Sequence, residues 1–396
     1  MTIRTSHISI VAETFAPEIN GVAHTLGRLV ASLRQRGHRV TIVRPRQRTY
    51  DGAGDEAGLT LVRGVPLPAS RGLQAGLPAA GLLRRAWTRD RPDAVYVATE
   101  GPLGWSAVSA ARALGIRVLS GFHTNFHCYA RHYRLGVLKP VIHAYLAAFH
   151  RRTDGTLTAS ADVRDELRTA GVDTVHVLGR GVDSDLFTPE RRCARLRHTW
   201  GASEAGLVAL YVGRLAPEKD LPLAVAAFRA IQRVSPDATF VVVGDGPERA
   251  ALQRRHPDLI FTGVRTGEDL ARHYASADLF LFPSATDTFG NVTLEAMASG
   301  LAVVAFDYAA AHHYISHGRH GLLAARHDRD AFVRHAVSAA CAPRHVAVLR
   351  QAARVRVAGL GWAGVADRFA ALLLDAQPEL RADVDLVPVR PPRHAV

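Results

Sequence analysis

Cysteine (3), methionine (2), lysine (2) and asparagine (3) are scarce in this chain of 396 residues. Cys128, Cys193 and Cys341 are too few for a disulfide framework and match no zinc spacing, so we expect reduced thiols in a cytoplasmic protein. The sequence has no run of about 18 uncharged apolar residues, so we expect no membrane-spanning helix. The first residues lead directly into a strand pattern, which predicts no signal peptide.

Arginine supplies nearly all of the basic side chains. Of the 49 basic residues 47 are arginine, and the two lysines are Lys139 and Lys219. Such a bias is typical of a GC-rich genome, which also disfavours asparagine codons. The lysines and asparagines that remain are therefore candidate functional residues, among them Lys219, Asn125 and Asn291.

The net charge of +13 is unevenly distributed. Residues 1–183 carry 24 basic and 14 acidic residues (+10), whereas residues 184–396 carry 25 and 22 (+3). A basic first half favours an anionic partner, either nucleic acid, an anionic membrane surface or a phosphorylated ligand, although a solvated surface would look the same. No helix-turn-helix, zinc-finger or RNA-binding aromatic motif is present, so we expect no nucleic-acid partner. A non-enzymatic protein that binds nucleotides or nucleic acid stays an alternative.

Two series of short apolar strands alternate with helical segments, which predicts an α/β fold with two doubly wound, Rossmann-like parallel-sheet domains. We expect an N-terminal domain over residues 1–183 and a C-terminal domain over residues 184–375. The last helix, about 362–374, could pack back on the first domain, and the Pro/Arg-rich tail 376–396 is expected to be poorly ordered. The expected strands are 7–12, 39–43, 94–97, 117–120 and 156–158, then 207–212, 239–243, 259–261, 279–282 and 302–305.

Polar motifs follow several of these strands, at the sheet edge where open α/β folds bind ligands. Gly21 lies where a loop after the first strand enters a helix, so backbone amides could approach an anion there. Arg214 and Lys219 follow the strand that ends at residue 212, and two cations across a proline turn suit a diphosphate.

The segment from Asp287 to Glu295 follows the strand at 279–282. The two carboxylates are eight positions apart, too far to be neighbours on one helical face, so we expect Asp287 in the loop and Glu295 on a helix beginning near Asn291. Gly290 would let backbone amides meet a phosphate at the helix start. A carboxylate accepts two hydrogen bonds from neighbouring hydroxyls, so Glu295 suits a ribose and Asp287 a sugar ring.

His123 follows a strand of the first domain and is accompanied by the rare Asn125, which favours a functional histidine over a buried structural one. Asp183 and Asp185 form a D-x-D pattern, which is a metal motif in some sugar transferases. Because that pair falls in the interdomain linker and not at a strand end, we expect no metal there.

Together these motifs resemble the retaining glycosyltransferases of family 4, which have the GT-B architecture of two Rossmann-like domains facing across a cleft. The resemblance covers about residues 7–375, and its most specific mark is the family's E-x7-E motif, here Asp287 to Glu295. Segments 13–22 and 122–126 are similar to one subgroup, the GDP-mannose-dependent α-mannosyltransferases and sulfoquinovosyl-diacylglycerol synthases.

The resemblance implies a role for each candidate residue. Arg214 and Lys219 would bind the donor diphosphate, helped by the loop at Gly21, and Glu295 would hold the ribose. Asp287 and His123 would be the catalytic residues that contact the transferred sugar. Asp287 departs from the family's glutamate by one methylene, which puts its reach to the sugar in doubt. Further donor contacts would come from backbone amides of Phe289, Gly290, Asn291 and Val292.

The resemblance also implies hexose transfer with retention and without a metal or other cofactor. The expected reaction moves mannose from GDP-mannose to a lipid-linked or glycolipid acceptor, and the alternative is a UDP-sugar donor carrying glucose or sulfoquinovose. Leu82–Arg89 places apolar positions 82, 83, 86 and 87 on one helical face beside arginines, and Tyr129–Arg134 is a second basic-aromatic stretch. We therefore expect peripheral contact with the inner face of the cell membrane through the N-terminal domain, unless that helical face belongs to the core.

Overall fold

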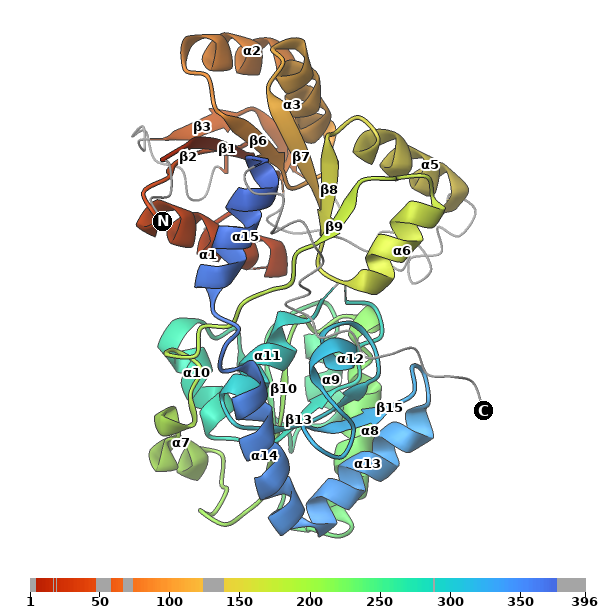
Figure 1. Ribbon diagram of the computed structural model, residues 1–396. Helices are drawn as coiled ribbons and strands as arrows, with labels where there is room; N and C mark the ends of the chain where they lie inside the picture. Colours follow the sequence, from red (N-terminus) through yellow and green to blue (C-terminus); the bar gives the residue numbers. More distant parts are fainter. Residues whose placement is uncertain are drawn as a thin grey trace. The chain divides into compact units, whose positions relative to one another are not determined.

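The computed structural model describes residues 5–16, 18, 20–47, 58–66, 74–123, 139–287 and 289–375. They divide into two compact units (Figure 1). The first contains the described residues up to Arg180 together with the helix Trp362–Leu373, and the second contains Gly181–Gly361. Each unit is built on one parallel sheet, so the predicted α/β class with two Rossmann-like domains is confirmed.

The sheet of the first unit has the strand order β3-β2-β1-β6-β7-β8-β9. Chain order runs outward from β1 in one direction and from β6 in the other, which is the doubly wound arrangement. A short antiparallel pair, β4 and β5, lies outside this sheet. The strands are β1 (His7–Val11), β2 (Arg39–Pro45), β3 (Leu59–Val62), β4 (Gly64–Pro66), β5 (Gln74–Gly76), β6 (Ala94–Val97), β7 (Arg117–Phe122), β8 (Gly155–Thr158) and β9 (Val175–Val177).

Helices cover both faces of this sheet. One face packs on α1 and α15, where the Phe369 ring meets Tyr96 edge-on at 4.9 Å between centroids. The other face packs on α2 and α3, with Leu83 and Trp87 of α2 in the core. The Asn20 side chain caps α1 by accepting from the amides of Val22 and Ala23. The helices are α1 (Gly21–Gln35), α2 (Ala80–Arg89), α3 (Pro102–Ala113), α5 (Lys139–His150), α6 (Ala161–Thr169) and α15 (Trp362–Leu373).

The sheet of the second unit has the order β12-β11-β10-β13-β14-β15. Its central strands are continuous apolar runs, as expected of strands buried on both faces. The strands are β10 (Val208–Val212), β11 (Thr239–Val243), β12 (Ile260–Gly263), β13 (Leu279–Phe282), β14 (Ala302–Phe306) and β15 (Leu322–Ala324). The helices are α7 (Ala194–Thr199), α8 (Leu221–Gln232), α9 (Arg249–Arg255), α10 (Gly267–Ala275), α11 (Asn291–Ala298), α12 (Ala309–Tyr314), α13 (Arg329–Cys341) and α14 (Pro343–Val357), with 3-10 turns η2 (Pro189–Arg191) and η3 (Pro217–Lys219).

Candidate active site

The chain order of the second sheet reverses between the neighbouring strands β10 and β13. Open α/β sheets bind ligands at such a reversal, beyond the carboxyl ends of the two strands. The segment with Arg214 and Lys219 follows β10, and the segment with Asp287 follows β13. Two motifs that are far apart in the sequence therefore meet at one point of the sheet.

Lys219 and Asp287 are in direct contact at this point. The Lys219 Nζ atom donates to Asp287 Oδ1 at 2.5 Å, and the side chains are 13% and 19% exposed, so the ion pair is partly shielded from water. The second carboxylate oxygen of Asp287, Oδ2, is buried and makes no hydrogen bond among the described residues. An oxygen in that position can accept a hydrogen bond from a ligand hydroxyl.

Arg214 lies beside the same segment and is 44% exposed. Its Nη1 atom is 3.7 Å from Oε1 of Glu218, a buried carboxylate whose oxygens make no hydrogen bond in the described part of the chain. The Arg214 carbonyl accepts a hydrogen bond of 3.1 Å from the hydroxyl of the buried Tyr211. Tyr211 thus supports the loop that carries Arg214, a role that the sequence did not reveal.

The start of α11 offers backbone N–H groups. Gly290 precedes the helix with φ +87°, a left-handed conformation that favours glycine, and it provides no side-chain cap. The first amides of a helix have no partner within the helix. Phe289 is buried, and its carbonyl accepts from the amide of Ala310, so its side chain belongs to the core. Asn291 and Val292 are half-buried at the first turn.

Glu295 lies on α11 and is 9% exposed. The hydroxyl of Tyr274, which is fully buried on α10, donates to Glu295 Oε2 at 2.9 Å. Burial together with the Glu295 charge raises the pKa of Tyr274 well above its usual range, so the phenol keeps its proton. The carboxylate is therefore held in one orientation by a donor from a neighbouring helix.

In the first unit the chain order reverses between β1 and β6, and two carboxyl groups follow these strands. Glu13 accepts from the amide of Leu103 at 3.2 Å, at the start of α3. Burial is the main cause that raises the pKa of Glu13 to about 7; the nearby Glu100 raises it further, whereas the Leu103 and Gly76 amides lower it. A Cβ at Gly101 would lie 2.1 Å from a Glu13 oxygen, so a larger residue there would force the Glu13 carboxylate to shift.

Gly21 begins α1 in the same unit, after the loop that follows β1. Open space surrounds the position where its Cβ would lie. The loop is held by side chains: Asn20 Nδ2 donates to Thr14 Oγ1 at 2.6 Å, and Thr14 donates to Glu18. Gly21 is exposed, but Asn20 already accepts from the amides of Val22 and Ala23, so an anion at this helix start would meet chiefly the Gly21 amide.

His123 follows β7 and is buried, with contacts at both ring nitrogens. Arg180 donates to its Nδ1 at 2.8 Å, and Tyr96 Oη lies 2.7 Å from Nε2. Since a guanidinium only donates, Nδ1 is the acceptor and the ring proton lies on Nε2. Burial is the main cause that holds the pKa of His123 well below its usual range, and the Arg180 charge adds to it. His123 is thus a neutral imidazole in a fixed orientation.

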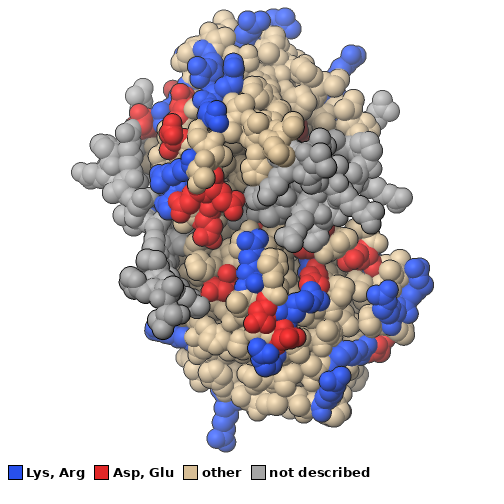
Figure 2. All heavy atoms as spheres, turned by 90° about the vertical axis from the view of Figure 1, so that its right-hand side faces the viewer, with Lys and Arg blue, Asp and Glu red and all other residues tan. Residues whose placement is uncertain are grey.

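The structure corrects one expectation about α2. Leu83 and Trp87 are buried in the core and Ala86 packs against it, so the apolar face of this helix does not meet solvent. Leu82 is 39% exposed, and the arginines 84, 85 and 89 are exposed. On the face of the molecule seen in Figure 2 basic and acidic side chains are interspersed, without a field of one sign among the described residues. None of the described helices is long and apolar enough to cross a membrane.

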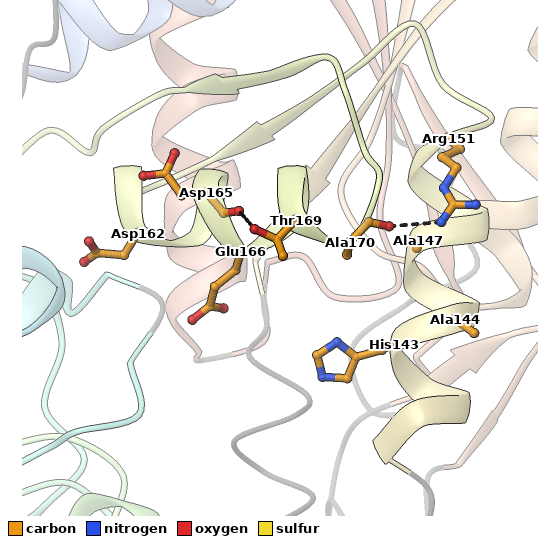
Figure 3. Close-up of a pocket in the computed structure, with 9 residues that line it drawn as sticks. All are labelled: His143, Ala144, Ala147, Arg151, Asp162, Asp165, Glu166, Thr169 and Ala170. Atoms are coloured by element: carbon orange, nitrogen blue, oxygen red, sulfur yellow. Dashed lines mark hydrogen bonds between the residues drawn. The ribbon is translucent and has the colours of Figure 1, made fainter.

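A groove of about 860 Å³ lies between α5 and α6 (Figure 3). Its α6 side carries carboxylates, and on its α5 side Arg151 donates to the Ala170 carbonyl at 3.0 Å. None of the site residues predicted from the sequence lines it. The lining residues are His143, Ala144, Ala147, Arg151, Asp162, Asp165, Glu166, Thr169 and Ala170.

Some predicted features lie outside the described residues: Asn125, Cys128, the stretch Tyr129–Arg134 and the tail 376–396. Within the described ranges, His, Cys, Asp and Glu residues form no group of three or more that could hold a metal ion. Asp183 instead accepts from the Leu186 amide at 3.0 Å, as a turn-capping residue does.

Comparisons with known proteins agree with this arrangement. The family model "Glycosyltransferase Family 4" matches residues 19–186, and the model "Glycosyl transferases group 1" matches residues 206–340. A GDP-mannose-dependent alpha-mannosyltransferase of Mycolicibacterium smegmatis is 36% identical over 80% of this chain and 84% of the relative. The sulfoquinovosyl transferase SQD2 of Arabidopsis thaliana is 30% identical over 72% of this chain and 56% of the relative.

Among solved structures, a sucrose-phosphate synthase from Thermosynechococcus elongatus aligns with a TM-score of 0.76 and covers 93% of this chain and 98% of its own. At 18% identity this likeness speaks for the fold alone, and it confirms the GT-B architecture. The fold, the two family models and the relatives covered over most of their length lead to one conclusion: the chain belongs to glycosyltransferase family 4 and is a glycosyltransferase.

Proposed function

We propose that this enzyme transfers mannose from GDP-mannose to a lipid-linked or glycolipid acceptor, with retention of configuration and without a metal ion. The observation that carries the proposal is the meeting of Lys219 and Asp287 at the reversal point of the second sheet, with Glu295 on the helix that follows. The named relatives support the donor and the acceptor class. They include mycobacterial enzymes that mannosylate phosphatidylinositol mannosides, one of them 30% identical over 74% of this chain.

The donor diphosphate is assigned to Arg214, Lys219 and the amides at the start of α11. As the bond to the sugar breaks, negative charge develops on the leaving diphosphate, and positive groups aimed at it lower the barrier. Two side-chain cations and the positive end of a helix can supply this charge without Mg²⁺. The backbone amide of Gly21, at the start of α1 in the other unit, is proposed to donate to the same diphosphate.

Glu295 is assigned to the donor ribose, because a carboxylate can accept from two neighbouring hydroxyls. Asp287 is assigned to the transferred sugar. Its Oδ1 atom is engaged by Lys219, which leaves the buried Oδ2 to accept from a sugar hydroxyl. The proposed Asp287 contact thus links the diphosphate-binding lysine to the reacting sugar.

His123 is proposed to lie beside the sugar as a neutral, fixed imidazole. Both of its ring nitrogens are bonded within the protein, and its low pKa opposes protonation. These contacts favour a positioning contact with the sugar over a role as general base.

Peripheral contact with the inner face of the membrane is proposed for the first unit, through exposed arginines 84, 85 and 89 and the exposed Leu82 of α2. Basic residues near anionic headgroups contribute about 1 kcal/mol each. Since the apolar face of α2 is buried, this contact would be mainly electrostatic and therefore sensitive to salt.

The donor is tested by calorimetry with GDP-mannose, UDP-glucose and UDP-sulfoquinovose, followed by transfer assays with lipid acceptors. GDP-mannose should bind at least about tenfold more tightly than either uridine donor, which is about 1.4 kcal/mol. Tighter binding of a uridine donor, with transfer of its sugar, would replace GDP-mannose in the proposal.

A further inference from the structure

We infer that Tyr274 is a positioning residue for the nucleotide: its hydroxyl sets the orientation in which Glu295 receives the donor ribose. This inference rests on the proposed ribose contact of Glu295. The direct observation is the hydrogen bond of 2.9 Å from the Tyr274 hydroxyl to Glu295 Oε2.

Burial makes the orientation of Glu295 depend on this hydrogen bond. Glu295 is 9% exposed and Tyr274 is fully buried, so water cannot readily replace either partner. A buried carboxylate without a donor is costly to maintain in its charged form. The phenol supplies a donor on the Oε2 side, and it cannot serve as an anion itself because its pKa lies well above the usual range.

The tyrosine ring is itself fixed. Phe187 packs against it edge-on at 5.6 Å between ring centroids, and Phe280 of β13 lies at 5.9 Å. Since the ring is held by aromatic neighbours, the hydroxyl is a rigid donor and the plane of the Glu295 carboxylate is set before the nucleotide binds. Preorganised contacts of this kind spare the ligand the cost of ordering the side chain.

The bond uses one of the roughly four lone-pair positions of a carboxylate, and a contact with two ribose hydroxyls needs two more. Without the phenol, Glu295 could still be present and charged, but its Oε2 atom would lose this donor and its carboxylate plane would be less firmly fixed. The inference therefore predicts a loss of ribose recognition specifically, and not a general loss of nucleotide binding.

The test compares GDP with 2′,3′-dideoxy-GDP by calorimetry in the full-length protein. The wild type should bind GDP more tightly by about tenfold or more, as expected for hydrogen bonds to a charged group. In Tyr274→Phe, which keeps the ring and removes only the hydroxyl, this ratio should fall to within about threefold. The change should come from weaker GDP binding, with little change for the dideoxy nucleotide.

Tyr211→Phe is the matched control, because Tyr211 is equally buried in the same unit but donates to the Arg214 carbonyl. It should weaken both nucleotides alike and leave the ratio unchanged. The double variant Tyr274→Phe/Glu295→Gln should have the same ratio as Glu295→Gln, because the phenol acts only through the carboxylate.

The outcomes separate the inference from the proposed function. A wild-type ratio near one means that no ribose contact exists, and the proposed role of Glu295 fails together with the inference. A large ratio that collapses in Glu295→Gln but persists in Tyr274→Phe overturns the inference alone. A lower melting temperature of Tyr274→Phe with an unchanged ratio also overturns it, because the hydroxyl would then be structural. If GDP does not bind, the uridine pair is used in the same way.

Discussion

Replacing Asp287 by Asn is expected to separate turnover from nucleotide binding. Lys219 Nζ donates to Asp287 Oδ1 at 2.5 Å, and both side chains are largely shielded from water. A diphosphate has to share this lysine with the carboxylate or draw it away. Without the carboxylate charge the lysine is freer and the diphosphate is repelled less, so GDP should bind Asp287→Asn equally well or up to about tenfold more tightly.

The magnitude follows from the contacts. A hydrogen bond to a charged group is worth about 1.5–3 kcal/mol, which corresponds to roughly 10–150-fold in affinity. Lys219→Met should therefore weaken GDP binding by about that factor, since the ammonium is lost and the Asp287 carboxylate then faces the diphosphate unpaired. The double variant Lys219→Met/Asp287→Asn should recover about tenfold of this loss, because the two groups are in contact and their effects are not additive.

The assay combines calorimetry of GDP with the steady-state rate of transfer. Asp258→Asn serves as control, since Asp258 pairs with Arg229 at 2.6 Å just before the amino end of β12, at the edge of the sheet away from the candidate site. Turnover should fall by about 10²-fold or more in Asp287→Asn and stay near wild type in the control. Equal losses of GDP affinity and turnover in Asp287→Asn would refute the reasoning, as would additive effects in the double variant.

Further predictions concern the donor, metal, pH and the membrane. Glu295→Ala should lower kcat/KM by roughly 10²-fold while the fold is kept, and wild-type activity would contradict its role. EDTA should leave activity within about twofold, because the protein's own cations oppose the diphosphate charge; loss that Mg²⁺ or Mn²⁺ restores would reopen Asp183 and Asp185. The pKa of Glu13 is raised from 4.5 to about 7, so the folded chain holds a proton that the unfolded chain releases, and stability is lost as pH rises through this window. Relative to wild type, Glu13→Gln should gain about 2–3 kcal/mol in free energy of unfolding from about pH 5 to about pH 8; a constant difference would refute this. Arg84→Glu/Arg85→Glu should co-sediment less with anionic liposomes, whereas Arg254→Glu/Arg255→Glu on α9 should not; equal recovery with neutral and anionic vesicles would remove the membrane contact.

The structure has all of the strands that the sequence predicted, within a few residues, and most of them are buried apolar runs. The strands that the sequence missed, β3, β4, β5, β9 and β15, have only three or four residues, and β3, β9 and β15 lie at edges of the two parallel sheets. A run as short as Leu322–Ala324 carries no period that separates it from a loop, and only the neighbouring β14 makes it a strand. Helix α2 was predicted as a helix, but its role was not. The periodicity of its apolar face fits a core contact and a membrane surface equally well, and only the structure shows the core contact.

The site could be predicted as far as its strand ends, since the βα pattern fixes which loops lie at the ligand-binding edge of each sheet. The contacts that hold the site residues in place could not be predicted. Tyr274 is 21 positions from Glu295, and Arg180 is 57 positions from His123. Such pairs depend on how one helix or loop packs against another, which no local pattern encodes. Arg180 lies just before the domain boundary that the sequence predicted at residue 183.

The central claim is tested most directly by following labelled mannose from GDP-mannose into the organic phase of a lipid-acceptor assay, with and without Lys219→Met. The account predicts α-linked mannose in the lipid product, release of GDP in equal amount, and a loss of roughly 10²-fold in the variant. Lipid labelling from UDP-glucose or UDP-sulfoquinovose with none from GDP-mannose, or an unimpaired Lys219→Met variant, would contradict it.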